Sequence, residues 1–134
     1  IYTGEDTLSL HDALPILAWF DGGDKAGLFY ARMDGEAWVS SPAKHFGDVN
    51  SQAGHPALIS DGEQVWLAWK EMTDTASLVK LVKSNDGGRS WDTPVVISQT
   101  KGKSDYPQLL LKDGQAYLAW NTEVDGLAWL KVSQ

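Results

Sequence analysis

The side chains best suited to chemistry in this chain are five polar residues at matching places in two similar segments. His55 and Tyr106 each stand directly before a proline, and Asp105 stands beside Tyr106. Glu71 and Glu123 each follow an apolar run that contains Leu-Ala-Trp. Carboxylate, hydroxyl and imidazole groups offer hydrogen bonds and aromatic rings offer flat faces, a combination that suits a sugar. For any one of these residues the alternative is an ordinary loop residue, since loops are generally polar.

Other reactive groups are sparse. The chain has no cysteine, which excludes thiolate chemistry and disulfides. Its three histidines lack the spacing of a metal site, and no glycine-rich segment resembles a phosphate-binding loop. We therefore expect neither a metal nor any other cofactor.

A sequence repeat indicates the secondary-structure elements that position these residues. Leu-Ala-Trp occurs at residues 17–19, 67–69 and 118–120, at intervals of 50 and 51 residues. Repetition at this period is typical of stacked arrays of small sheets. Asp61-Gly62 and Asp113-Gly114 each separate two apolar runs. Such pairs indicate hairpins, because a tight turn between strands needs positive φ.

Each copy predicts an antiparallel meander of up to four strands. No window has a sustained 3.6-residue period, so we expect essentially no helix. The predicted strands are residues 27–33 and 36–42 after the first Leu-Ala-Trp strand, 57–60, 64–70, 77–84 and 90–98 in the second copy, and 108–111, 115–121 and 126–133 in the third.

The second strand of each copy is apolar on both faces. In the middle copy Leu67 and Trp69 share one face, while Trp66 and Ala68 share the other. Such a sheet needs a neighbour on each side, and four-stranded sheets stacked around an axis form a β-propeller. We therefore predict an all-β, partial propeller of about three blades. A β-sandwich with accidental repetition is the alternative. The predicted blades are residues 17–50, 51–101 and an incomplete 102–134.

One turn of the middle blade, SNDGGRSW, has a specific pattern. Asp86 can accept hydrogen bonds from N–H groups of the loop, and Ser84 can tie the strand end to the turn. Gly87 and Gly88 can take positive φ, and Trp91 can fold its ring under the hairpin. With its Ser, Asp, Gly and Trp in register, this segment resembles the Asp box of the sialidase-like, or BNR-repeat, β-propellers.

This resemblance covers about residues 17–134 and implies a fragment of a six-bladed propeller. The first blade keeps a worn box with Asp34, Gly35 and Trp38. In the family the box is structural and lies opposite the active site, which implies that Arg89, inside it, is a solvated turn residue. The resemblance implies that substrate-facing residues lie at the other end, where the five polar candidates are expected.

The same resemblance bears on catalysis. A sialidase uses three arginines to clamp the sialate carboxylate, a Tyr–Glu nucleophile pair and an Asp acid/base. This chain has only two arginines, Arg32 and Arg89, and neither is expected near the axis. The resemblance therefore implies the C-terminal part of an exo-glycosidase that is itself inactive. The alternative is a non-catalytic propeller that binds a glycan or a protein.

The net charge and the expected apolar surface limit the kinds of partner that this chain can bind. A net charge of −7 without a basic cluster argues against nucleic acid and anionic membranes, and no apolar run reaches membrane-spanning length. A glycan is the expected ligand. An open arc of blades leaves an apolar face at each end, which predicts self-association, and two copies would close a six-bladed ring. The family resemblance implies a secreted or periplasmic bacterial protein.

Residues 1–16 differ from the rest of the chain. They resemble the translation of a common short-read sequencing adaptor, with Gly4, Glu5 and Asp6 as its variable index. We therefore expect a non-native segment in which His11 and Asp12 carry no function, and upstream blades that are missing. The alternative is a natural inner strand, because the alternation in TLSL suits one.

Overall fold

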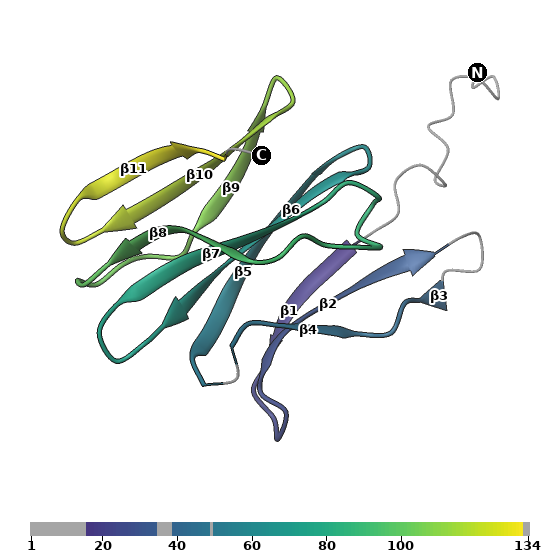
Figure 1. The fold of residues 1–134 in the computed structure, drawn as a ribbon, viewed down its shortest axis with the longest axis horizontal. Coiled ribbons are helices and arrows are strands. Elements are labelled where there is room, and N and C mark those ends of the chain that lie inside the picture. The colour runs from purple at the N-terminus through teal and green to yellow at the C-terminus, as the bar shows by residue number, and fades with distance from the viewer. Residues whose placement is uncertain (1–15, 35–38, 49, 133–134) are drawn as a thin grey trace, which may run out of the picture.

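The computed structural model describes residues 16–34, 39–48 and 50–132, which form three antiparallel β-sheets (Figure 1). These residues contain no helix, as predicted, and therefore none that could span a bilayer. Of the unusual segment 1–16, only Ile16 is described, and Gly35 and Trp38 of the worn box also lie outside the described residues. The strands are β1 (Ile16–Asp21), β2 (Gly27–Asp34), β3 (Val39–Ser40), β4 (Lys44–Phe46), β5 (Gln52–Asp61), β6 (Gln64–Met72), β7 (Ser77–Ser84), β8 (Val95–Thr100), β9 (Gln108–Lys112), β10 (Gln115–Thr122) and β11 (Gly126–Lys131).

The middle and third sheets are the meanders that the sequence predicted. The middle sheet has the order β5-β6-β7-β8, and the third has the order β11-β10-β9. The β5–β6 hairpin turns through Gly62 with φ 60°, and the β9–β10 hairpin turns through Asp113 and Gly114 with φ 51° and 72°. Positive φ at these positions matches the twist of the strands that the turns join, so both predicted hairpins are confirmed.

The first sheet departs from the prediction at its outer edge. A single fourth strand was expected at 36–42, but two short strands, β3 and β4, both pair with β2. Pro42 lies between them and has no N–H with which to extend the ladder. The prediction of one continuous strand was therefore wrong. The strand that it missed, β4, carries His45 and Phe46 to one end of the sheet.

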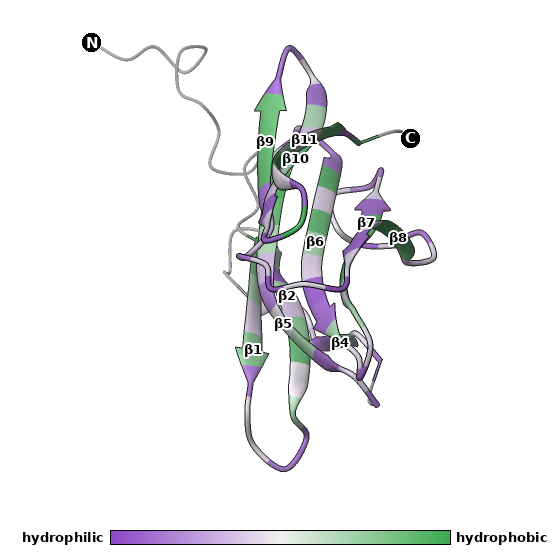
Figure 2. Ribbon diagram, turned by 90° about the vertical axis from the view of Figure 1, so that its left-hand side faces the viewer, coloured by the Kyte–Doolittle hydropathy of each residue, from purple (hydrophilic) through white to green (hydrophobic). Residues whose placement is uncertain are grey.

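The three sheets stack face to face in chain order. Strand β5 contacts β1 on one side and β9 on the other, so the middle sheet is sandwiched (Figure 1). On β6, Leu67 and Trp69 pack toward the first sheet, while Trp66 and Ala68 pack toward the third. All four side chains are buried, and Figure 2 shows hydrophobic residues along β6 in the middle of the molecule. The two apolar faces predicted for this strand are therefore both covered.

The three tryptophans of the repeat have unequal surroundings. Trp120 on β10 is buried against the middle sheet, just as Trp69 on β6 is buried against the first. Trp19 on β1 is only partly buried and stacks on Phe29 of the same sheet, with ring centroids 5.9 Å apart. Because Ala18 packs toward the middle sheet, Trp19 belongs to the opposite face. That face of the first sheet is covered by no other sheet in the described part of the chain.

The third sheet has an open apolar face at the other end of the stack. On β11, Leu127 and Trp129 are exposed. They pair with Asn121 and Ala119 of β10, which alternate with the buried residues Leu118 and Trp120 and so point away from the middle sheet. The stack therefore ends in an apolar sheet face on each side.

Candidate functional site

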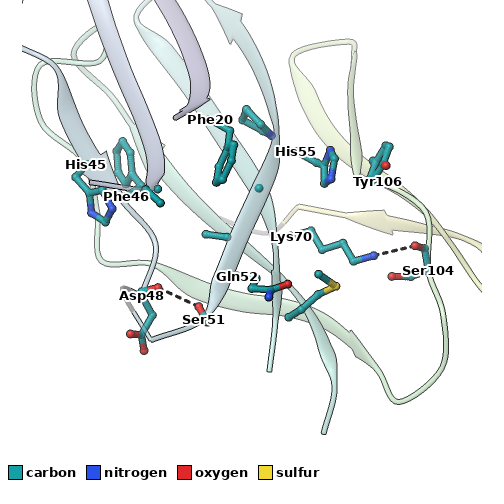
Figure 3. A pocket seen from close by; sticks show the side chains of 16 residues that line it. Phe20, His45, Phe46, Asp48, Ser51, Gln52, His55, Lys70, Ser104 and Tyr106 are labelled. Atoms are coloured by element: carbon teal, nitrogen blue, oxygen red, sulfur yellow. Dashed lines mark hydrogen bonds between the residues drawn. The ribbon is translucent and has the colours of Figure 1, made fainter. Parts of the chain in front are cut away.

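A cavity of about 830 Å³ lies where the three sheets come together (Figure 3). It is bounded by the end of β1, by β4, by the start of β5, by the end of β6 and by the loop before β9. Its size falls in the range of small-molecule sites, which combine apolar walls with a few polar groups. The side chains that matter for its chemistry are Phe20, His45, His55, Lys70, Ser104 and Tyr106.

Two of the predicted residues meet on the cavity wall. His55 and Tyr106 stack with their ring centroids 3.5 Å apart and their planes at 18°. They come from different parts of the fold, His55 from β5 of the middle sheet and Tyr106 from the loop before β9. Figure 3 shows both rings beside the cavity. Tyr106 is 56% exposed, so its ring and hydroxyl are accessible from outside.

The backbone at His55 is irregular. The β5–β6 register shifts between Gly54 and Ala57, and His55 takes a φ of 55°. A histidine in the left-handed region costs free energy that surrounding contacts must offset, and such strain is concentrated at functional sites. A bulge also re-aims side chains, which is how β5 turns the imidazole toward Tyr106.

Tyr106 is positioned by the residue before it. The backbone carbonyl of Asp105 accepts a hydrogen bond from the Trp120 indole at 3.0 Å, and its carboxylate accepts one from the side-chain amide of Asn121 at 2.9 Å. The Asp105 amide donates to the Asn121 carbonyl at 2.9 Å. Asp105 does not line the cavity. It fixes the loop that presents Tyr106.

Glu123 serves the same loop. Its carboxylate accepts a hydrogen bond from the Lys103 amide at 3.1 Å, and its own amide donates to the Lys103 carbonyl at 2.8 Å. Glu123 is exposed and lies outside the cavity wall.

Glu71 is buried inside the protein rather than facing the cavity. It is 1% exposed and accepts hydrogen bonds from the Trp69 indole at 2.8 Å and the Asp48 amide at 3.1 Å. Lys80 forms an ion pair with it at 2.7 Å. Burial acts to raise the pKa of Glu71, but the hydrogen bonds from Lys80, Trp69 and Asp48 together lower it. Glu71 therefore ties the loop between β4 and β5, through Asp48, to β6 and β7 of the middle sheet.

Three further residues line the cavity, and the sequence contains a signal for two of them. Phe20 and Lys70 each directly follow Leu-Ala-Trp, so an alignment of the repeats would have singled them out. His45 had no such signal, because its strand β4 was not predicted. A Cβ on Gly27 would overlap the His45 imidazole, so the ring occupies space that this glycine leaves open. No cluster of three potential metal ligands occurs among the described residues.

The SNDGGRSW turn is held by its own side chains. The Ser84 hydroxyl donates to the Asp86 carboxylate at 2.8 Å and accepts from the Gly88 amide at 2.8 Å. Asp86 also accepts from the Ser90 hydroxyl at 2.5 Å and from the amides of Ser90 and Arg89 at 2.8 and 3.0 Å. Hydrogen bonds from the Ser90 hydroxyl and amide, and then from Ser84, hold the pKa of Asp86 well below its usual range.

The same turn anchors an aromatic cluster between the first two sheets. Trp91 packs edge-on against Tyr30 and Phe46, at centroid distances of 5.1 and 5.6 Å. The Tyr30 hydroxyl donates to the Gly88 carbonyl at 2.9 Å, which joins the turn to the first sheet.

The turn lies at the other end of the sheet from the cavity. Ser84 pairs with Val65 at the start of β6, whereas Met72, at the end of β6, lines the cavity. Arg89 is exposed within the turn, and neither it nor Arg32 lines the cavity.

Comparison with known proteins gives one informative match. No family model matches the sequence, and no curated protein matches it. A solved structure, the crystal structure of an exo-1,5-alpha-L-arabinanase from a bovine ruminal metagenomic library, matches with a TM-score of 0.55 and 13% identity. The match covers 90% of this chain and 48% of that one, so this chain spans about half of its length. At this identity the likeness shows the fold, and the three stacked sheets are part of a β-propeller.

Proposed function

We propose that the chain forms three blades of a carbohydrate-active β-propeller and that its cavity binds a glycan. The observation that carries the proposal is the stacked pair of His55 and Tyr106 on a cavity bounded by the first two sheets and by the loop before β9. Aromatic faces beside hydrogen-bonding groups suit the two sides of a sugar ring. The strained backbone at His55 and the structural likeness to a glycan-degrading enzyme support the same class of ligand.

Binding without hydrolysis is the activity we propose for this chain. Hydrolysis of a glycosidic bond ordinarily needs two carboxyl groups flanking that bond. Asp48 supplies the single carboxylate among the described residues that line the cavity. Glu71 and Asp105 are engaged in hydrogen bonds elsewhere.

As a second candidate, we propose that the complete protein is an exo-glycosidase of sialidase-like architecture with six blades. The hydrogen-bonded turn at Ser84 and Asp86 supports this assignment, as does its position at the end opposite the cavity. The likeness to an exo-arabinanase favours an exo-acting glycosidase more broadly. The missing catalytic groups would then belong to other blades.

Replacing Tyr106 by alanine is expected to weaken glycan binding at least tenfold, because the substitution removes one ring of the stacked pair. Binding is measured by isothermal titration calorimetry after screening the chain on a glycan array. His55→Ala is expected to have a similar effect. Tyr117→Ala, on the open face of β10, is the matched control and should leave the affinity unchanged.

Two results would contradict the proposal. The array would show no bound glycan, or Tyr106→Ala and Tyr117→Ala would bind equally well. In the same samples, fluorogenic sialosides and arabinofuranosides are expected to stay intact. Turnover by the purified chain would overturn the assignment of binding without hydrolysis.

The two open sheet faces lead us to propose that the chain forms a homodimer, with the first sheet of each copy stacked on the third sheet of the other. Light scattering after size exclusion is expected to give about twice the 14.7 kDa mass of one chain. Trp129→Glu places a charge on the open face of the third sheet and should yield monomers. Val95→Glu changes a similarly exposed apolar residue away from that face and is the control. A parent chain that stays monomeric as its concentration is raised would refute the dimer, because association must increase with concentration.

A further inference from the structure

Lys70 is a buried cation at the edge of the cavity. Its side chain lines the cavity and the residue is only 8% exposed. The ammonium donates one hydrogen bond, to the Ser104 carbonyl at 2.8 Å, and Figure 3 shows it reaching across to that residue. Within the described part of the chain, no carboxylate lies within ion-pair distance of it. Lysine is seldom buried to this extent without an anionic partner, because the charge loses its hydration.

The acidic residues that directly follow Lys70 and Ser104 in the sequence are already engaged. Glu71, the next residue on β6, points to the opposite face and pairs with Lys80. Asp105, the next residue after Ser104, accepts its hydrogen bond from Asn121. The Lys70 ammonium therefore keeps N–H donors that no carboxylate of the described chain satisfies.

A second unsatisfied group lies beside it. The Ser104 hydroxyl oxygen is buried and has no hydrogen-bond partner among the described residues, although Ser104 lines the same cavity. A buried polar atom without a partner is uncommon in proteins, and each one calls for an explanation such as a functional role. Lys70 and Ser104 thus place a cation and a hydroxyl at one point of the cavity.

We propose that Lys70 binds the carboxylate of a sugar acid, so that the cavity takes an acidic glycan in preference to a neutral one. The sugar part rests on the glycan-binding function proposed above, whereas the carboxylate site rests on Lys70 itself. A carboxylate carries one negative charge and matches one ammonium through charge-assisted hydrogen bonds. A phosphate ester, with its higher charge, ordinarily requires several cationic side chains. The sugar ring would find its apolar contacts on the aromatic rings of the cavity wall, which belong to His55, Tyr106 and Phe20.

The test uses pairs of methyl glycosides that differ only at C6, where one member has a carboxylate and the other a hydroxymethyl group. Gluco, galacto and manno pairs are titrated by isothermal titration calorimetry, together with sodium acetate. We expect at least one uronide to bind tenfold or more tightly than its neutral partner. Lys70→Met should abolish that preference, and Lys70→Arg should retain part of it. Lys83→Met is the control, because Lys83 lies over the Trp66 ring rather than in the cavity.

The outcomes separate this inference from the proposed function. Equal affinity for acidic and neutral sugars would overturn the Lys70 assignment while glycan binding stands, and so would an acid preference that survives Lys70→Met. Acetate binding that depends on Lys70, without binding of any sugar, would support the carboxylate site and overturn glycan binding. If no compound binds, both proposals fail. Thermal melting of each variant verifies that it folds, and a glucose 6-phosphate titration tests whether a phosphate competes for the same cation.

Discussion

Replacing Trp69 by alanine is expected to lower the free energy of unfolding by about 3–5 kcal/mol, the range for removing a fully buried tryptophan. The ring fills the space between the first and middle sheets and touches Phe46, with centroids 5.8 Å apart. Its indole N–H also donates to the buried carboxylate of Glu71. The substitution therefore opens a cavity and removes one of the hydrogen bonds that stabilise that charge. Urea denaturation followed by circular dichroism measures the change.

The repeat supplies matched controls for this measurement. Trp120→Ala is expected to cost a similar amount, because Trp120 is buried against the preceding sheet in the same way. Trp19→Ala should cost only about 1 kcal/mol, the contribution of its stacking on Phe29. Three equal costs at low protein concentration would contradict the stacking described above. A Trp19→Ala cost that grows with concentration would instead show that a second copy covers the first sheet.

The tryptophans also illustrate what could be predicted from the sequence. Successive side chains of a strand point to opposite faces, which predicted that Leu67 and Trp69 share one face and that both faces are apolar. A strand that is apolar on both faces requires a sheet stacked on each side. The Asp-Gly pairs located both hairpins, because each supplies a residue that accepts positive φ in the turn: Gly62 in the first, and Asp113 and Gly114 in the second. Patterns that depend on local chemistry and on burial thus predicted most of the fold.

Other features depended on interactions that no local pattern encodes. Pro42 divides the outer strand of the first sheet, yet the short strand that resumes at Lys44 has no signal of its own. The bulge at His55 interrupts the pairing of β5 with β6, and the residue that takes positive φ there is the histidine and not the adjacent Gly54. Because the bulge aims His55 at Tyr106, the feature that best defines the site was among the least predictable.

The candidate site could be predicted only in part for a related reason. His55 and Tyr106 were identified from their shared place before a proline, and both line the cavity. Glu71 was expected beside them because it follows the second strand. Strand β6 in fact continues to Met72, and Glu71 pairs with Ala53 and Leu78 within the sheet, so its side chain alternates inward. Where a strand ends decides whether the next carboxylate is a ligand or part of the core.

The buried position of Glu71 predicts a large effect when its carboxylate is removed. Glu71→Ala is expected to destabilise the fold by about 3 kcal/mol, the lower end of the range for breaking a buried ion pair, because Lys80 is partly exposed and can be rehydrated. The Trp69 indole and the Asp48 amide would lose their acceptor at the same time. Glu71→Gln keeps a hydrogen-bond acceptor and should cost less. Urea denaturation of both variants and of Lys80→Met measures the coupling between the two charges.

The pH dependence of stability tests more sharply whether Glu71 is charged in the folded protein. The pKa of Glu71 is lower in the folded protein than its ordinary value of 4.5, so the unfolded chain binds a proton here more readily than the folded one. The stabilisation that Glu71 provides is therefore complete above that ordinary value and is lost as the pH falls through the folded pKa. We expect the cost of Glu71→Gln to be largest near neutral pH and to shrink on acidification below 4.5. A cost that stays constant through this range would mean that the carboxylate is not held charged by Lys80, Trp69 and Asp48, and that another interaction holds the loop between β4 and β5 against the middle sheet.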